Sequence, residues 1–510
     1  MSHRVRYRGA EIIIPTTLAQ IPASYIITQI NLNGTKIYLA INGETGLVEF
    51  SGTDAATVIQ SVINALTPGR TWKKRVALKG YFEISDKILI PSYTILDLRG
   101  AYLKLADGAN VTVIETEQFA THCEIIGGII DGNKENQNPT GEIYGIKLSA
   151  SQYSRVIGTT VINVHYDGII VAGGFRNKII DVYVKGCGHN GVTFWSSDRT
   201  VYRGHLGIGI ISEDNGLEGV GLGTVGGVVV SCLATGGNSR GIATDGGQDN
   251  IITDHRSDGD EYGAFIAGER IVYKSFVIKN PTKRGIIIKP AGDGTLPDGV
   301  KLDTGIILNP AEHGIDIRDS KLIELENVRV IGSGDHGISI TGTQNNHEIR
   351  IRNCILMNNT GSGVRIGSTD SIIKSVIIHR IKATGNKYGI YFGNNTTSEE
   401  LIIEDSDLRN NNTSAIYIWG PITTKRIKRN LGYVTENGGV ATFSGDGSTT
   451  QFQIAHGLVA EPETVDITPL SADAAGDFYV TKDSTYIYVN YLSPPPSGTN
   501  NVVLSWRAEV

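Results

Sequence analysis

Carboxyl groups that could act together are densest between residues 213 and 270. Glycoside hydrolysis needs one protonated carboxylic acid and one ionised carboxylate, about 5 to 5.5 Å apart for retention or about 6.5 to 9.5 Å for inversion. A chain segment that repeatedly returns to one surface supplies such distances. The acids and the histidine in this stretch are Glu213, Asp214, Glu218, Asp245, Asp249, Asp254, His255, Asp258, Asp260, Glu261 and Glu269.

Asp245 is the centre of the predicted catalytic pair. It falls on a predicted sheet surface, Glu218 in the turn before it, and Asp260 and Glu261 in the turn after it. We therefore predict that Asp245 acts with one of these three acids. The alternative is that the acids are turn residues, because Asp and Asn side chains bond to the nearby backbone.

Aromatic and basic residues around these acids predict sugar binding. Trp195 and Phe265 flank Asp245 and could form a platform for a sugar ring. A second cluster could hold an anionic sugar or serve lyase chemistry, which needs a base and a neutralised carboxylate. The substrate-binding candidates are thus Trp195, Phe265, Lys289, His313, Asp316 and Arg318, with Glu312 beside them.

Other polar residues have simpler interpretations. His165, Asp167 and His189 precede strands at corresponding turns, and we interpret them as turn residues. The acidic loop 257–261 (SDGDE) suggests Ca²⁺, but it lacks the ligand spacing of an EF-hand. No metal site or cofactor is therefore predicted. The four cysteines show no CxxC spacing and are predicted to lie in the interior.

A repeat aligned on one glycine must position these side chains. Most neighbouring repeats are 22, 23 or 26 residues apart, and the 50-residue gap from Gly191 to Gly241 must hold about two units. Such a period suits three short strands per turn and predicts an all-β right-handed parallel β-helix, with Ile, Val and Leu stacked inside. The aligned glycines are Gly145, Gly168, Gly191, Gly241, Gly263, Gly285, Gly314, Gly337, Gly363 and Gly389, with Ala415 in the next unit.

The flanks of this repeat differ from it. Residues 1–50 read as a small β-rich head. An amphipathic helix over 54–66 begins the β-helix region 51–430 and would cover its open first coil. From 431 to 510 the sequence alternates with turns every 8 to 12 residues, which predicts a β-sandwich.

Composition and charge exclude several classes of protein. The formal net charge of -6 offers no basic face for nucleic acid. No apolar run is long enough to cross a membrane, and the N-terminus lacks the apolar core of a signal peptide.

Two segments of the sequence resemble parts of known proteins. SGTDAATVIQSVINAL, with YFEISDKILI and GGIIDGN behind it, resembles the start of pectate-lyase-superfamily β-helices, and GYVTEN…HGL resembles the terminal domains of phage tailspike and preneck-appendage proteins. The order of segments resembles a phage tailspike. That resemblance implies a homotrimer on the virion, attached to the tail or baseplate by the head. It further implies a β-helix that binds or cleaves a host cell-surface polysaccharide, and a C-terminal domain for trimerisation or glycan binding.

The resemblance leaves the reaction open. The NTD, DD and RIK motifs of polygalacturonases are missing, so pectin is a poor candidate substrate. A glycoside hydrolase is favoured because acids outnumber bases in the richest stretch. A polysaccharide lyase and a non-catalytic receptor-binding adhesin are the alternatives.

Overall fold

The computed structural model describes residues 2–7, 10–15, 23–196, 203–342, 346–367, 371–394 and 396–510. It is almost entirely β structure, with 3% helix and about 13 parallel solenoid turns within the described residues, and this confirms the predicted fold class. The chain divides into two compact units, Met1–Ile323 and Glu324–Val510.

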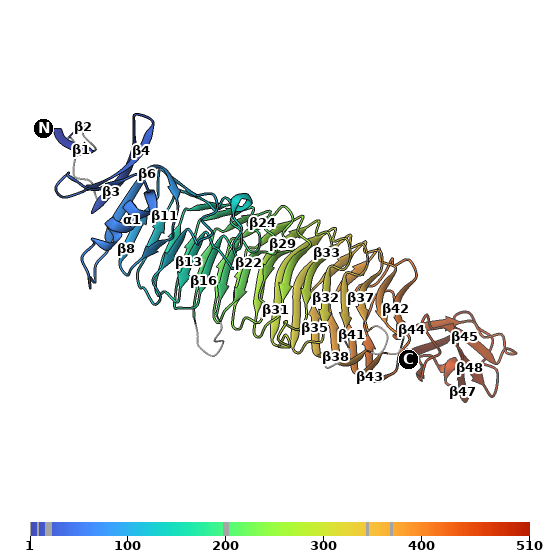
Figure 1. The fold of residues 1–510 in the computed structure, drawn as a ribbon. Coiled ribbons are helices and arrows are strands. Elements are labelled where there is room, and N and C mark those ends of the chain that lie inside the picture. Colours follow the sequence, from blue (N-terminus) through green and yellow to red (C-terminus); the bar gives the residue numbers. More distant parts are fainter. Residues whose placement is uncertain are drawn as a thin grey trace. The chain divides into compact units, whose positions relative to one another are not determined.

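One strand of every coil in the first unit belongs to a parallel sheet that we call the glycine sheet, because each repeat glycine lies within one of its strands or directly before one (Figure 1). In this unit its strands are β7 (Ile88–Ile90), β10 (Ile114–Thr116), β13 (Ile146–Ser149), β16 (Ile169–Ala172), β19 (Val192–Trp195), β22 (Glu218–Gly223), β25 (Arg240–Ala243), β28 (Tyr262–Ile266), β30 (Arg284–Ile288) and β32 (Ile315–Arg318).

The remaining strands of these coils pair with their equivalents one coil away, also in parallel. They are β6 (Lys74–Ile84), β8 (Thr94–Asp97), β9 (Ala101–Leu105), β11 (Glu124–Ile126), β12 (Ile129–Asp131), β14 (Arg155–Ile157), β15 (Thr160–Ile162), β17 (Lys178–Ile180), β18 (Tyr183–Lys185), β20 (Leu206–Ile208), β21 (Ile211–Glu213), β23 (Val228–Val230), β24 (Leu233–Thr235), β26 (Ile251–Thr253), β27 (Arg256–Asp258), β29 (Val272–Lys279) and β31 (Val300–Leu308). A short 3₁₀ helix, η1, covers Lys134–Asn136.

The N-terminal segment contains two antiparallel arrangements and the helix. β1 (Ser2–Tyr7) pairs with β2 (Ala10–Pro15), and β4 (Thr35–Asn42) lies between β3 (Tyr25–Leu32) and β5 (Val48–Gly52). β3 also runs parallel to β6, so this part of the predicted head continues a solenoid sheet. The predicted helix forms as α1 (Ala55–Asn64), where Asp54 accepts a hydrogen bond from the Thr57 N–H at 2.7 Å. Its covering of the first coil stays a prediction.

The glycine repeat is explained by close backbone approach. A Cβ added to Gly145 would lie 2.6 Å from the carbonyl oxygen of Gly168, and one on Gly241 would lie 2.6 Å from that of Gly263. No larger residue fits where neighbouring coils are so close. The residue after each glycine points inward, and this interior column is buried throughout: Ile146, Ile169, Val192, Val220, Ile242, Ala264, Ile286 and Ile315.

Buried amide side chains link consecutive coils at one corner. The Asn215 side-chain oxygen accepts from the Cys187 N–H at 2.9 Å, and the Asn238 oxygen accepts from the Asn215 N–H at 3.0 Å. Asp260 continues this ladder, accepting from the Asn238 N–H at 3.1 Å. Each bond satisfies a backbone group that water cannot reach.

Asp260 is therefore a member of this buried ladder, and its predicted catalytic role stays a prediction that its burial does not favour. It is 0% exposed and also accepts a hydrogen bond from the Ser257 hydroxyl at 2.7 Å. Burial raises its pKa from 3.8 to about 6, although bonds from Ser257 and Asn238 act in the opposite direction. The cysteines Cys123, Cys187, Cys232 and Cys354 are free and buried, as predicted.

The second unit contains further coils and a C-terminal pair of sheets. Its glycine-sheet strands are β34 (Ile338–Thr341), β37 (Ser362–Ile366), β40 (Tyr388–Phe392) and β42 (Ser414–Ile418). The other coil strands are β33 (Ile323–Ile331), which begins at the unit boundary, β35 (Asn346–Arg352), β36 (Ile355–Met357), β38 (Ile372–His379), β39 (Lys382–Thr384), β41 (Thr397–Glu404) and β43 (Ile422–Lys428).

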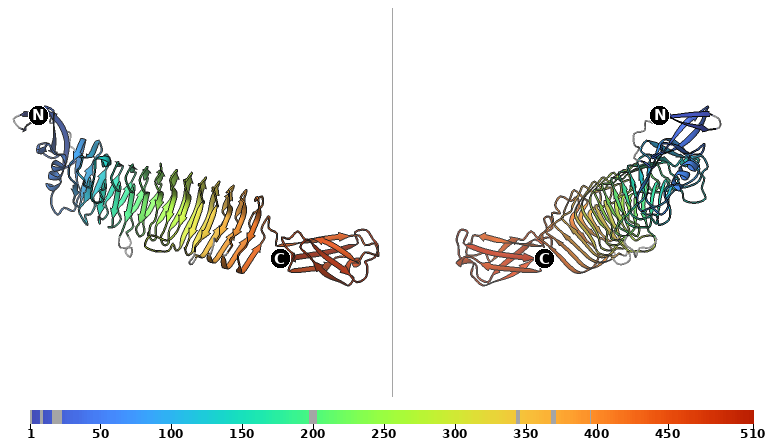
Figure 2. Two further views of the ribbon diagram at one scale, coloured as in Figure 1. Left: turned by 45° about the vertical axis from the view of Figure 1, so that its right-hand side comes forward. Right: turned by 90° about the vertical axis from the view of Figure 1, so that its left-hand side faces the viewer.

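Two three-stranded antiparallel sheets form the C-terminal domain, as predicted (Figure 2). One has the order β44 (Glu436–Phe443), β49 (Val502–Glu509), β46 (Thr464–Pro469), and the other β45 (Gln451–Ala455), β48 (Tyr486–Tyr491), β47 (Phe478–Lys482). The 3₁₀ helix η2 covers Ala472–Ala474. Ile487, Val489 and Leu504 are fully buried in the core of this domain.

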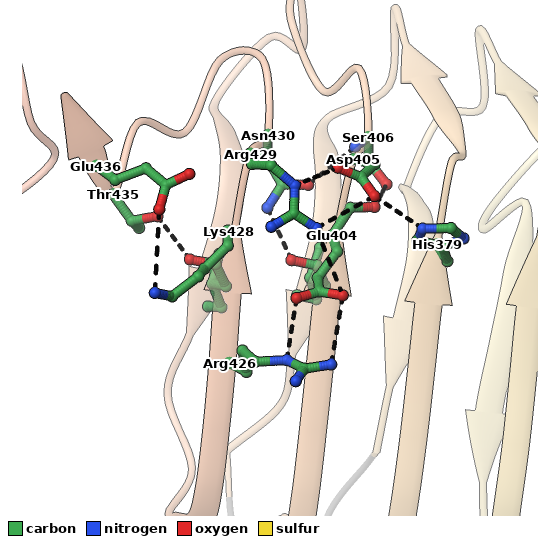
Figure 3. Close-up of polar contacts among 12 residues, drawn as sticks. His379, Glu404, Asp405, Ser406, Arg426, Lys428, Arg429, Asn430, Thr435 and Glu436 are labelled. Carbon is green, nitrogen blue, oxygen red and sulfur yellow. Dashed lines mark hydrogen bonds and ion pairs between the residues drawn. The ribbon is translucent and has the colours of Figure 1, made fainter. Parts of the chain in front are cut away.

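Ion pairs connect the last coil to this domain (Figure 3). Lys428 on β43 lies 3.7 Å from Glu509 and 4.0 Å from Glu436. Next to it, Arg429 and His379 contact Asp405 at 2.6 and 2.8 Å and lower the pKa of that carboxyl to about 2. Such surface pairs fix local geometry more than they stabilise the fold.

We predict that Asp260→Asn stabilises the protein at alkaline pH. The folded-state pKa of Asp260 is raised, so the favourable protonated form is fully present below about pH 4 and is lost as the pH rises through about 6. Asparagine keeps the Oδ1 acceptor without the charge, and its amide N–H can donate to the Ser257 hydroxyl as the Asn215 amide donates to the Ser212 hydroxyl at 2.9 Å. Melting curves should show a gain of roughly 2 °C at pH 8 that disappears near pH 4. A loss of stability at both pH values would contradict the ladder assignment.

Candidate functional site

A hollow of about 390 Å³ opens on the outer face of the glycine sheet in the first unit. Strands β19, β22 and β25 form its floor, where the small residues Gly221 and Gly223 leave room above the sheet. The polar and aromatic residues around it are His189, Asn190, Thr193, Trp195, Glu218, Arg240, Asp245 and Asp293. Three predicted residues, Trp195, Glu218 and Asp245, thus come together.

Glu218 is the most perturbed acid of the hollow. Glu218 is 6% exposed. Burial raises the pKa of its carboxyl to about 7, and the nearby Arg240 guanidinium acts in the opposite direction. Arg240 donates to Glu218 Oε1 at 2.9 Å. A Cβ at position 221 would lie 2.3 Å from Glu218 Oε2, so the glycine there makes room for the carboxyl. A carboxyl group whose pKa is about 7 can both donate and accept a proton at physiological pH.

Asp245 and Glu218 share one guanidinium. Asp245 Oδ2 lies 3.9 Å from the Arg240 nitrogen that contacts Glu218. The two carboxylate oxygens are therefore no more than about 7 Å apart, a bound compatible with both geometries of glycoside hydrolysis. Unlike Glu218, Asp245 is exposed to solvent. The pair thus combines a buried acid with a solvated one.

His189 and Asp167 form a second polar group at the rim. His189 Nδ1 contacts Asp167 at 2.7 Å, and this hydrogen bond raises the pKa of the imidazole. Asp167 also accepts from the Asn190 N–H and the Thr193 hydroxyl, each at 3.0 Å. The Tyr166 ring stacks on His189 with centroids 4.2 Å apart. These contacts hold the imidazole in one orientation, so interpreting both residues only as turn residues was too narrow.

The Trp195 side chain and the loop after β30 form two sides of the hollow. Trp195 is 49% exposed and its ring lies against Gly223. The loop after β30 supplies Gly292 and Asp293, and its Ala291 packs with Phe265 and Ile287 on the outer face of the sheet. Phe265 is consequently only 5% exposed, with Arg240 3.9 Å and Lys289 5.2 Å from its ring centroid. The prediction that Phe265 offers an exposed sugar platform is wrong, because it supports Arg240 from below.

The other predicted residues lie outside the hollow. Glu261 pairs with Lys283 at 2.9 Å, which lowers its pKa. Asp316 is buried between Arg284 and Arg318, at 3.2 and 2.8 Å. In the second predicted cluster, the Asp316 carboxylate is thus paired with arginines of the same chain. His313 of this cluster is partly buried.

The residues just before the repeat glycines form a column of polar side chains in the hollow. The sequence analysis did not single out this position of the repeat. Asp167, Asn190, Glu218 and Arg240 all hold this position. The Asn190 side chain accepts from the Glu218 N–H at 3.0 Å, and Glu218 pairs in register with Arg240. The signal was present in the alignment on glycine, where these positions change from Tyr to Asp, Asn, Glu and Arg.

Among the residues that the structure describes, no group of three His, Cys, Asp or Glu side chains is arranged to hold a metal ion. Within the same ranges, no helix is both long and apolar enough to cross a membrane.

Comparisons with known proteins agree with this architecture. Residues 241–398 match the model of the right-handed β-helix region. The chain carries a right-handed β-helix. Its fold resembles that of bacteriophage Phi29 gene product 12. No curated protein matches the chain significantly.

Three solved structures illustrate the likeness. The N-terminal fragment of bacteriophage Phi29 gene product 12 has 16% identity and a TM-score of 0.55, over 77% of this chain and 72% of that one. The pre-mature form of that product has 16% identity and a TM-score of 0.53, over 77% and 57%. A tailspike mutant of E. coli bacteriophage HK620 in complex with a pentasaccharide has 12% identity and a TM-score of 0.45, over 89% and 90%.

The electrostatics of the hollow predict a measurable response in Glu218. Replacing Arg240 by alanine removes the cation that lowers the Glu218 pKa, so this pKa should rise further above about 7. A ¹³C titration of labelled glutamate carboxyls, with the signal assigned by its absence in Glu218→Gln, measures the shift. An unchanged or lowered pKa in Arg240→Ala would contradict the described pairing.

Proposed function

We propose that this chain is a phage tail protein that binds a host cell-surface polysaccharide and depolymerises it as a glycoside hydrolase. The observation that carries the proposal is a carboxyl group, Glu218, buried in an open hollow with a pKa near 7 and a second carboxylate within about 7 Å. The likeness to bacteriophage structures supports this setting at the level of the fold.

Glu218 is the proposed general acid. At neutral pH a substantial fraction of it carries a proton, which it can give to the oxygen of the departing sugar. Arg240 orients the carboxyl through its bond to Oε1, while Oε2 lies over the floor at Gly221. The proton donor is thereby fixed at the base of the hollow, where a glycan lying across the sheet would reach it.

Asp245 is the proposed second carboxylate. Exposure to water keeps an ionised carboxylate well solvated, and Arg240 lies within 3.9 Å of it. In this position it can stabilise the positive charge that develops on the sugar, either by attacking the anomeric carbon or by activating a water molecule. The bound of about 7 Å between the carboxylates leaves both stereochemical outcomes open.

Trp195 and His189 are the proposed substrate-binding residues. The half-exposed indole offers an apolar surface to the C–H face of a sugar ring, and its N–H can bond to a hydroxyl group. His189, held by Asp167, can bond to a second hydroxyl group. Homotrimerisation and attachment to the virion through residues 1–50 stay predictions that follow from the tailspike resemblance.

The His189–Asp167 pair also favours a second candidate, a polysaccharide lyase. An imidazole oriented by a carboxylate resembles the base required for β-elimination, and Arg240 could neutralise a uronate carboxyl group. The raised pKa of His189 weakens this candidate, because a protonated imidazole cannot accept the proton. A lyase leaves a carbon–carbon double bond that absorbs ultraviolet light, whereas a hydrolase releases only reducing ends.

We predict that Glu218→Gln and Asp245→Asn each lower depolymerisation by about 10² to 10⁴-fold, because each removes one carboxyl group required for proton transfer or charge stabilisation. Both variants should keep the melting behaviour and the polysaccharide binding of the parent protein. Reducing-end release from the host polysaccharide and gel retardation by it measure the two properties.

Glu261→Gln is the matched control, since Glu261 is an acid on the same surface outside the hollow. It should retain activity. Full activity in both hollow variants would overturn the hydrolase proposal, and binding without any cleavage by the parent protein would identify a non-catalytic adhesin.

The pH profile should follow the protonation of Glu218. Because the acid must carry its proton, activity should fall as the pH rises through about 7, by roughly tenfold for each further pH unit. In Arg240→Ala this limb should move to higher pH if any activity is left. A profile flat from pH 6 to pH 9 would contradict the assignment of Glu218 as the acid.

A further inference from the structure

A second groove lies on the glycine sheet of the second unit. It has a volume of about 460 Å³, and its lining includes His336, Ser362, Arg365, Lys387, Tyr388 and Tyr391. Three of them, His336, Ser362 and Tyr388, directly precede repeat glycines, as Glu218 and Arg240 do in the first unit. The groove is therefore built from the same column of the repeat but with different chemistry.

Aromatic side chains form a continuous surface here. Tyr391 and Tyr417 are in register on β40 and β42, and their rings stack with centroids 5.7 Å apart and planes 7° apart. Tyr388 lies 5.2 Å from Tyr391, and Trp419, which is 59% exposed, lies edge-on to Tyr417 at 6.0 Å. So much exposed aromatic surface is costly in water unless a ligand covers it.

Two cations, Arg365 and Lys387, border this surface, together with one carboxylate, Asp335, which lies 3.2 Å from His336 Nε2. Arg365 is in register with Tyr391, and Lys387 lies 5.6 Å from the Tyr388 ring centroid. Among the residues that the structure describes, neither cation forms an ion pair, although most other arginines of this unit do, for example Arg409 with Asp407 at 2.9 Å. With two cations against one carboxylate, the groove has a local excess of positive charge in a chain of net charge -6.

We propose that this groove is a second polysaccharide-binding site, selective for a sugar residue that bears a carboxylate. The tyrosine rings receive the C–H faces of consecutive sugars, and Arg365 and Lys387 bind the carboxylate, which a guanidinium can contact with two parallel hydrogen bonds. His336 is already engaged, since its Nδ1 accepts from the Ser362 N–H at 2.9 Å. The inference rests on the proposed function, because it identifies the polysaccharide as acidic.

Affinity electrophoresis of the full chain tests this inference. Native gels are cast with one of three acidic polysaccharides (alginate, hyaluronan or polysialic acid) or with neutral dextran. We expect retardation by at least one acidic polymer and none by dextran. Arg365→Gln and Tyr417→Ala should each weaken the retardation about tenfold or more, as expected for loss of a charged hydrogen bond or a stacking partner, and Tyr417→Phe should retain it.

Two control variants separate this site from other surfaces. Tyr479→Ala removes an exposed tyrosine of the C-terminal domain, and Lys425→Gln removes an exposed lysine of β43. Neither should change retardation. Retardation by dextran as well, by none of the acidic polymers, or equally in Arg365→Gln and the parent protein would overturn the proposal.

The two proposals fail in distinguishable ways. Glu218→Gln should lose cleavage and keep retardation, whereas Arg365→Gln should lose retardation and keep cleavage of short oligosaccharides. If the parent protein is retarded but cleaves nothing, the hydrolase proposal fails while the binding site stands. If it cleaves the polysaccharide and Arg365→Gln binds as well as the parent, only the second site is refuted.

Discussion

The parallel hydrogen bonding between consecutive coils is the constraint on which the rest of this structure depends. It holds equivalent residues of successive coils in register about 4.8 Å apart, so each position of the repeat becomes a column. The column after the repeat glycine is the buried apolar interior, and the column of glycines keeps the coils close enough to pair. Chemistry is possible only on columns that these two requirements leave free.

The position before the glycine is one of these free columns. In the first unit it brings Glu218 and Arg240 together, since residues 22 apart in sequence become neighbours in space. In the second unit it supplies Ser362 and Tyr388. Two opposing effects set the Glu218 pKa in the first hollow. Burial raises it and Arg240 lowers it, and the resulting pKa of about 7 suits proton transfer at neutral pH.

The sequence was sufficient for the architecture and for part of the site. Glycine spacing predicts the coils, and the 3.6-residue pattern after Asp54 predicts the helix, because both depend on local periodicity. Trp195 and Asp245 could be proposed from their positions after the repeat glycines, whereas Glu218 was expected in a turn and lies at the start of β22. Arg240 could also have been found by its position, since it precedes Gly241 as Glu218 precedes Gly219.

Two residues lie in surroundings that periodicity does not encode. Phe265 occupies an outward position of the repeat. The irregular loop after β30 covers it, and the course of that loop is not periodic. Asp260 belongs to a buried ladder with Asn215 and Asn238, and only the spacing of 23 and 22 residues between these three positions indicates it. Acid density alone therefore could not separate buried from reactive carboxyls.

The central claim is that Glu218 protonates the leaving oxygen of a glycan bound across the first hollow. A crystal structure of Glu218→Gln with an oligosaccharide of the host polysaccharide tests it most directly. The account predicts a glycosidic oxygen within about 2.6 to 3.2 Å of the residue 218 side chain, with a sugar ring against Trp195. An oligosaccharide bound elsewhere on the protein, with the first hollow empty, would contradict it.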